Sequence, residues 1–276
     1  MTERQFLFCA GECTATMKAV FSLDNWTHTM SAKRFELLPN FHIRRSGITE
    51  DIKGIVYFAH VENRDLDRKN LELISVSGIP CWPNADDLLR MIDRHEVMRE
   101  CVFLGLTSHT VQFVTHGEYI SITRPFVIKT GQQHRGEGKF IVCDGEPIPE
   151  WEGVATVEPF FKGRSARVLI IGDRQWVIEF DNKESWIKNS AGADIISCEE
   201  LDRSSKIVQH ACVTASVFGL DVAGVDYIVD DSGDDFHFLE VNQFPGVNVS
   251  DDVVEHSQKY FIKMMETIEK DANVKY

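Results

Sequence analysis

The sequence predicts an α+β fold in which antiparallel hairpins and helices follow one another along the chain. Three stretches consist of two apolar runs around a short polar turn, which is typical of β-hairpins. Three other stretches repeat apolar residues at helical spacing. At 276 residues the chain is long enough to bury a sizeable core, divided among two or three subdomains.

The first part of the chain is predicted to be a small α/β domain over residues 1–85. Its short apolar runs, QFLFCA, GIVYFA and LELISVSGIP, alternate with polar segments.

A helix is predicted after Pro83, because Asn84 can cap it and Asp86 and Asp87 suit its first turn. Apolar residues continue this helix at roughly helical spacing: Leu88, Leu89, Ile92, Val97 and Met98.

Strands dominate the central part of the chain. VQFVTHGEYISI is predicted to be a hairpin that turns at His116 and Gly117, and the strand PFVIKT follows it. The apolar and β-branched residues of these runs suit a pleated, half-buried surface. We therefore assign residues 86–157 to a central subdomain.

The last part of the chain alternates hairpins with helices. ARVLIIGDRQWVIEF is predicted to be a second hairpin with its turn near Gly172 and Asp173. An amphipathic helix over 204–219 comes next, followed by a third hairpin in GVDYIVDDSGDDFHFLEVN. A terminal helix with an apolar face ends the chain. These elements are assigned to a C-terminal lobe over 158–276.

Composition excludes several classes of protein. The formal net charge of -14 argues against sequence-independent binding of nucleic acid, which requires an excess of basic residues. No run approaches the roughly 18 consecutive apolar residues of a membrane span, so no membrane partner is expected. The seven cysteines are an odd number without a CxxC pair, which predicts reduced thiols, no disulfides and a cytoplasmic location.

The third hairpin carries oxygen-bearing side chains that indicate a metal site. Because side chains alternate along a strand, Glu240 and Asn242 are expected on one face. The same alternation places Phe236 and Phe238 beside them, and Asp226 lies across the hairpin. Two or three protein oxygens suit Mg²⁺, with Mn²⁺ as an alternative, because water and phosphates complete its shell. A solvated surface strand is the structural alternative.

An upstream segment, RPFVIKTGQQHRGEGKF, combines a lysine with a glycine-rich loop. Lys129 ends the predicted strand, and Gly131, Gly136 and Gly138 follow among polar residues. Glycines let backbone N–H groups approach phosphate oxygens, and a lysine supplies a positive charge. The segment is not a Walker loop, because it lacks GK[ST]. By itself it also fits a flexible loop with a solvated lysine.

Together these segments resemble the ATP-grasp superfamily, especially its RimK-like group, whose closing pattern runs GVD, a short hairpin, EVN and PG. The resemblance implies an N-terminal α/β domain, a central lid and a C-terminal antiparallel-sheet lobe. It implies that Asp226, Glu240 and Asn242 are metal ligands. It also implies that Lys129 and the loop containing Gly136 and Gly138 close over ATP.

The segment TVEPFFKGRSARVLIIGDR is similar to the hinge of this superfamily. The resemblance implies that Glu158, Pro159 and Phe160 hold the adenine and ribose. It also implies that Arg167, on the first strand of the C-terminal lobe, steadies the γ-phosphate or the acyl phosphate. Lys129 and Arg167 are then the catalytic residues. An exposed strand residue is the structural alternative for Arg167.

Some positions depart from the RimK-like pattern. Ser165 stands where that group has Asp, and in WIKN an Ile187 stands where it has Arg. Asn189 matches the pattern and is implied to bind the nucleotide, while Lys188 could supply the missing charge. In GIPCWPNADDLLRMIDRHEVM, which resembles the segment leading into the ATP domain, Arg94 stands where lysine is usual. These departures leave the ligated molecule open.

The resemblance implies an ATP-dependent carboxylate-amine ligase that forms an amide or peptide bond through an acyl phosphate and releases ADP and phosphate. ATP and Mg²⁺ or Mn²⁺ are its expected cofactors. A small-molecule carboxylate and amine, or a peptide or protein terminus, are its expected partners. An ATP-grasp-like small-molecule kinase and a non-catalytic nucleotide-binding protein are the alternatives. Apolar residues on the terminal helix leave a homo-oligomer open.

Overall fold

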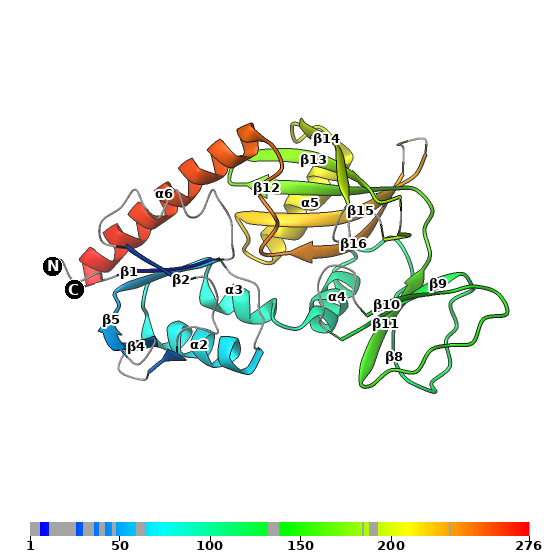
Figure 1. Cartoon of the computed structure of the whole chain (residues 1–276), viewed down its shortest axis with the longest axis horizontal. Coiled ribbons are helices and arrows are strands. Elements are labelled where there is room, and N and C mark those ends of the chain that lie inside the picture. Colours follow the sequence, from blue (N-terminus) through cyan, green and yellow to red (C-terminus); the bar gives the residue numbers. More distant parts are fainter. Residues whose placement is uncertain are drawn as a thin grey trace.

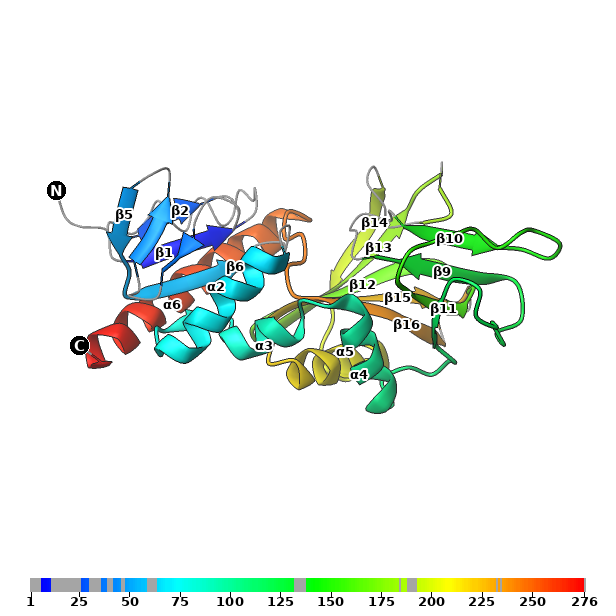
Figure 2. The ribbon, with the colours of Figure 1, turned by 90° about the horizontal axis from the view of Figure 1, so that it is seen from below.

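The chain is arranged in three parts, each built around a β-sheet (Figure 1). The computed structural model describes residues 6–10, 26–29, 36–38, 42–45, 48–58, 64–131, 138–183, 185–187, 193–231, 233 and 235–275. Helices cover the N-terminal and C-terminal sheets, and the central sheet projects at the far end (Figure 2). The predicted α+β fold class is confirmed.

The N-terminal sheet is parallel, with strand order β2-β1-β6-β7. Its strands are β1 (Phe6–Ala10), β2 (Trp26–Thr29), β6 (Gly54–Phe58) and β7 (Cys81–Trp82), and the helix α2 (Arg64–Ser77) lies between β6 and β7 in the chain. A small antiparallel sheet contains β3 (Glu36–Leu37), β4 (His42–Arg45) and β5 (Ile48–Asp51). Every residue of β6 is buried, as expected for a parallel strand covered on both faces.

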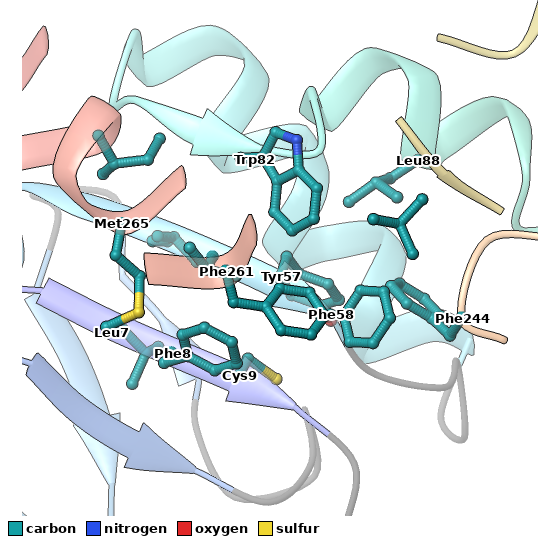
Figure 3. Packing of buried hydrophobic residues seen from close by; sticks show 14 of the residues in the cluster. Leu7, Phe8, Cys9, Tyr57, Phe58, Trp82, Leu88, Phe244, Phe261 and Met265 are labelled. Atoms are coloured by element: carbon teal, nitrogen blue, oxygen red, sulfur yellow. The ribbon is translucent and has the colours of Figure 1, made fainter. Parts of the chain in front are cut away.

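The terminal helix α6 (Asp251–Lys275) packs with the N-terminal sheet. The Phe261 ring lies 6.0 Å from that of Phe8 and 4.9 Å from that of Phe58, within one apolar cluster (Figure 3). The sequence predicts this helix within the C-terminal lobe over 158–276. Its buried residues lie in one apolar cluster with the N-terminal strands and also with Leu169 and Ile171 of the C-terminal lobe, so the helix joins these two parts of the chain.

Two helices connect the N-terminal sheet to the central sheet, whereas the sequence predicts one. Asn84 caps α3 (Ala85–Arg90) as expected, because its side chain accepts from the N–H of Asp86 at 2.8 Å. Asp93 then starts α4 (Arg94–Phe103) by accepting from the N–H of His95 at 2.9 Å. A capping aspartate competes with continued helix, which explains the break.

The central sheet is antiparallel and has the order β10-β9-β11-β8. Its strands are β8 (Gln112–Thr115), β9 (Phe126–Thr130), β10 (Lys139–Val142) and β11 (Val154–Pro159). The hairpin predicted at His116 and Gly117 is wrong, because β8 pairs with β11 and residues 118–125 form no strand. The Gln112 side chain accepts the N–H groups of Ser121 and Ile122 and replaces the expected ladder.

The C-terminal sheet has the order β14-β13-β12-β15-β16 and is antiparallel. Its strands are β12 (Arg164–Ile171), β13 (Arg174–Asp181), β14 (Asp194–Glu200), β15 (Val222–Val229) and β16 (Phe236–Asn242). Both hairpins predicted here are confirmed, as is the helix α5 (Lys206–Val217). α4 and α5 pack on one face of this sheet, around a cluster that includes Val168, Val225 and Tyr227 (Figure 2). The opposite face carries Leu169 and Ile171, which are buried in the cluster of the N-terminal sheet, and Arg167 follows the same alternation along β12.

The structure also bears on thiols and membranes. All cysteines in the described part of the chain are free, and Cys9 and Cys101 among them are buried. Among the described helices, none combines the length and the apolar character needed to cross a membrane.

Candidate active site

An arginine and an aspartate face each other on the C-terminal sheet. Arg167 of β12 is the cross-strand partner of Asp226 of β15, and its Nε and Nη2 donate to Oδ1 and Oδ2 at 2.6 and 2.9 Å. A Cβ on Gly224 would meet Arg167 Cδ at 3.1 Å and Pro245 at 2.8 Å, so glycine provides the room. Burial alone would lower the pKa of Arg167, but Asp226 raises it.

The neighbouring strand β16 adds a second carboxylate and an amide. Glu240 pairs with Asp226, and Asn242 pairs with Gly224, so their side chains share a face. Asn242 Nδ2 lies 3.2 Å from Asp226 Oδ2 and 3.5 Å from Glu240 Oε1. The structure therefore brings together the three side chains that the sequence singles out.

The alternation predicted for the start of β16 is wrong. Glu240 pairs with Asp226 but Phe238 pairs with Tyr227, so Leu239 is an extra residue and forms a bulge. An extra residue reverses the alternation beyond it. Phe238 is consequently buried with Tyr227 on the opposite face, together with Phe236.

His237 is the residue that the bulge brings to the site face. It is the partner of Ile228, and its ring stacks on the ring of Phe161 at 3.8 Å with an interplanar angle of 14°. His109 meets the same Phe161 ring edge-on at 4.9 Å. No sequence pattern indicated this aromatic group, because the three residues come from separate segments and one depends on the bulge.

The central sheet presents a buried ion pair to the same region. Thr156 of β11 is opposite Lys129 of β9, so Glu158, two residues further on, lies on the face of Lys129. Lys129 Nζ is 2.7 Å from Glu158 Oε1, and His109 Nε2 is 3.5 Å from Oε2. Burial would raise the pKa of Glu158, but Lys129 and His109 lower it to about 2. Burial lowers the pKa of Lys129, and Glu158 opposes that shift.

Contacts between the two sheets close the site. Lys129 Nζ donates to the backbone oxygen of Leu239 at 3.4 Å. Arg94, at the start of α4, forms an ion pair with Glu240 Oε2, and Lys139 Nζ lies 3.9 Å from the same oxygen. Burial lowers the pKa of Lys139 to about 7, and the nearby Arg94 and Lys129 add to the shift. Several basic groups thus lie close together between the sheets, and such groups are what a polyphosphate would need.

Solved structures share this architecture, although no protein-family model and no curated protein sequence matches the chain. D-alanyl-alanine synthetase A from Vibrio cholerae matches with a TM-score of 0.67 and 13% identity, over 97% of this chain and 99% of that one. D-alanine–D-alanine ligase from Bacillus anthracis complexed with ATP matches with a TM-score of 0.65 and 16% identity, over 100% of both chains. The ATP-grasp ligase PsnB complexed with a minimal precursor matches with a TM-score of 0.60 and 11% identity, over 95% and 98%.

The chain has an ATP-grasp fold. At these identities the likeness concerns the architecture, and it does not distinguish a RimK-like group within the ATP-grasp fold. The candidate site lies between the central and C-terminal sheets of that fold, where Lys129 contacts Leu239 and Lys139 approaches Glu240.

The hinge predicted for an ATP-grasp protein lies where β11 ends. Glu158 and Pro159 close this strand, and the N–H of Phe160 donates to Pro125 O at 3.0 Å. The Glu158 carboxylate is already engaged by Lys129 and His109. Of the three residues predicted as the hinge, Glu158 is therefore the one whose side chain other residues already hold.

The predicted glycine loop is described at its two ends. Gly138 accepts from the N–H and hydroxyl of Thr130 at 2.7 and 3.1 Å, which ties the start of β10 to the end of β9. Gly136 lies outside the described residues, as do Lys188 and Asn189 of the WIKN segment. Their assignments remain predictions.

The donor set near Asp226 fits a hard divalent cation. In the part of the chain that the structure describes, no three His, Cys, Asp or Glu side chains cluster as a metal site. A metal here would have two carboxylates and, once the Asn242 amide turns, one amide oxygen. Such an incomplete oxygen set suits Mg²⁺, because water and phosphate oxygens complete its shell.

Proposed function

We propose that the protein is an ATP-dependent carboxylate-amine ligase. The observation that carries the proposal is the convergence of Asp226, Glu240 and Asn242 with Lys129 and Arg167 between two sheets of an ATP-grasp fold. A role in stability does not explain this grouping, because a buried ion pair seldom stabilises the folded state more than apolar residues of similar volume would. A site for a charged substrate and its metal does explain it.

Asp226, Glu240 and Asn242 are the proposed metal ligands, for Mg²⁺ or Mn²⁺. When bound, the metal would neutralise charge on the phosphates of ATP. The paired arrangement of Asp226 and Glu240 across the hairpin supports this assignment. Arg167, held by both oxygens of Asp226, is proposed to steady the transferred phosphoryl group.

Lys129 is proposed to bind the α- and β-phosphates. Glu158 fixes its ammonium group at 2.7 Å, so the charge is in place before the nucleotide arrives. Glu158, Pro159 and Phe160 are the proposed hinge for adenine and ribose, and Glu158 also holds Lys129 in place. Gly136, Gly138 and Asn189 are proposed as further nucleotide contacts from the loops.

The proposed reaction proceeds in two displacements. A carboxylate oxygen of the substrate attacks the γ-phosphorus of ATP, and ADP leaves, which gives an acyl phosphate. An amine then attacks the acyl carbon, phosphate leaves, and the amine nitrogen loses a proton as the amide forms. Neither displacement requires a protein nucleophile, because charge neutralisation and positioning supply the catalysis.

The substrates are proposed only as a class, namely a small carboxylate and an amine or a peptide terminus. Among the similar structures, D-alanyl-alanine synthetase A is named for a product made of two small amino acids. PsnB was solved in complex with a minimal precursor. Ser165 is buried at 2% exposure on the strand that carries Arg167, where the RimK-like pattern has an acid. This difference supports a carboxylate-amine pair other than that of the RimK-like ligases.

The test is to incubate the protein and Mg-ATP with mixtures of amino acids and peptides. A ligase releases ADP and phosphate together and yields a product whose mass is the sum of two substrates less one water. A small-molecule kinase would release ADP and yield a phosphorylated product. A non-catalytic nucleotide-binding protein would release no ADP, and either of these outcomes would overturn the proposal.

A further inference from the structure

Lys139 is a buried basic residue of the site that the proposed ligand set does not use. It begins β10 directly opposite Lys129 of β9, so both lysines point from the central sheet toward the C-terminal sheet. Only 12% of its side chain is exposed, and its Nζ lies 3.9 Å from Glu240 Oε2. A lysine is rarely buried to this extent without a charged partner.

The partner oxygen of Lys139 is shared. Arg94 forms an ion pair with the same Oε2 of Glu240, so two cations meet on one carboxylate oxygen. Glu240 is also a proposed metal ligand. A divalent cation on Glu240 would repel both basic groups, because unlike water the buried site screens charge poorly. The arrangement in the structure and a metal-bound arrangement therefore require different partners for Lys139.

We propose that Lys139 is a further catalytic residue, which contacts the phosphates of the nucleotide when a metal occupies Glu240. The inference rests on the proposed function and adds a second lysine to the phosphate site. The ammonium group suits this exchange, because it carries three donors on a flexible stem and binds phosphate as a point charge. Lys139 Nζ lies 3.9 Å from Glu240 Oε2 and is opposite Lys129, so it is next to the proposed phosphate ligand.

The inference predicts opposite effects on two binding reactions. Lys139→Met keeps an unbranched side chain of nearly the same length and removes its charge. Calorimetric titration with Mg²⁺ and a non-hydrolysable ATP analogue should show binding weakened about 10- to 100-fold, the loss typical of a charge-assisted hydrogen bond. Titration with Mn²⁺ alone should show tighter binding than in the wild type, because one competing cation at Glu240 is gone.

Two further variants keep the result interpretable. Lys139→Arg retains the charge and should keep most of the nucleotide affinity, which also tests the site if the methionine variant folds poorly. Lys259→Met removes a lysine of α6 whose side chain is 71% exposed, and it should change neither titration. Circular dichroism on each variant confirms that the fold is intact.

The outcomes separate this inference from the proposed function. If the wild type binds the nucleotide and Lys139→Met binds both ligands as the wild type does, Lys139 is not a phosphate ligand. Weaker binding of both the nucleotide and Mn²⁺ by Lys139→Met would also overturn the inference, since it would indicate a structural role. If the wild type itself binds no Mg-nucleotide, the proposed function fails and the inference fails with it.

Discussion

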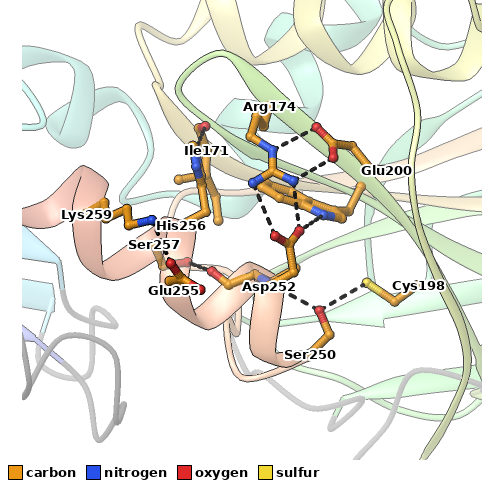
Figure 4. Close-up of polar contacts among 12 residues, drawn as sticks. Ile171, Arg174, Cys198, Glu200, Ser250, Asp252, Glu255, His256, Ser257 and Lys259 are labelled. Atoms are coloured by element: carbon orange, nitrogen blue, oxygen red, sulfur yellow. Dashed lines mark hydrogen bonds and ion pairs between the residues drawn. The ribbon is translucent and has the colours of Figure 1, made fainter.

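Two of the arginine–acid clusters at the C-terminal sheet differ in how much water reaches them. In the first, the side chains of Arg167 and Asp226 are 18% and 1% exposed. In the second, those of Arg174, Glu200 and Asp252 are 30%, 47% and 58% exposed (Figure 4). The same chemical groups are therefore placed in two very different dielectric environments.

The exposed cluster joins three elements at the surface. Arg174 of β13 donates through Nε and Nη2 to both oxygens of Glu200 on β14, at 2.7 and 2.5 Å. It also donates to Asp252 in the first turn of α6, at 2.8 Å (Figure 4). Trp176 Nε1 donates to Asp252 as well, at 3.2 Å. Its geometry is nearly ideal, yet water screens each of these pairs.

The buried clusters are costly by comparison. Moving a charge out of water carries a desolvation penalty that its partner offsets only in part. The site nevertheless contains two such pairs, Arg167 with Asp226 and Lys129 with Glu158. The exposed cluster joins elements at the surface, and we propose that the buried pairs are retained for binding.

Breaking a buried pair should have the largest effect on stability. Lys129→Met leaves Glu158 charged at 1% exposure, so the free energy of unfolding should fall by about 3–5 kcal/mol. Adding Glu158→Leu removes the stranded charge, so the double variant should recover much of that loss while ATP turnover stays absent. Urea unfolding and ADP release measure the two properties. A double variant as unstable as the single one would contradict this account.

Acid should weaken the same pair. Because the folded-state pKa of Glu158 is lowered from 4.5 to about 2, its stabilising contribution is present above pH 4.5 and is lost as the pH falls toward 2. The free energy of unfolding of the wild type should therefore fall more steeply across this window than that of Lys129→Met/Glu158→Leu. Parallel acid profiles for the two proteins would show that Glu158 is not held ionised by its partners.

Breaking the exposed cluster should have the smallest effect. Arg174→Met should lower the free energy of unfolding by at most about 1 kcal/mol, because each ion pair is exposed. The difference from the wild type should shrink in about 1 M salt, where charges are screened within roughly 3 Å. ATP turnover should not change. A loss of turnover in this variant would remove the contrast between the two clusters.

Local signals predicted much of the C-terminal sheet. The hairpins β12–β13 and β15–β16 follow from apolar runs around short turns, and Gly172 supplies the positive φ that the first turn needs. Glu240 and Asn242 share a face because no bulge lies between them. Features that depend on neighbouring residues in the sequence were thus within reach.

Features that depend on residues far apart in the sequence could not be predicted from local patterns. The bulge at Leu239 depends on pairing with β15, and it decides that His237 rather than Phe238 faces the site. The strand β8 pairs with β11, although the segment that directly follows β8 has a turn and an apolar run that could form a hairpin with it. The docking of α6 on the N-terminal sheet brings together the two ends of the chain. Only tertiary packing chooses among such alternatives.

The basic residues of the site show the same limit. In the sequence, Arg94 is marked only by standing where the ATP-grasp pattern has lysine, and Lys139 directly follows Gly138 of the predicted glycine loop. Their meeting at Glu240 requires α4, the central sheet and the C-terminal sheet to be in place. The register of Lys139 with Lys129 is the signal that would have indicated it, once the strand pairing was known.

The most direct test of the central claim compares two proposed metal ligands with a carboxylate of the exposed cluster. Glu240→Ala and Asn242→Ala should each lower Mg-ATP turnover by at least about 10²-fold, the loss typical of removing one group that stabilises transition-state charge. Asp252→Ala, at the exposed cluster, is the matched control and should keep wild-type turnover. Turnover is measured as ADP released in the presence of the amino-acid and peptide mixture. Wild-type turnover in both Glu240→Ala and Asn242→Ala would contradict the claim that these residues form the metal and nucleotide site.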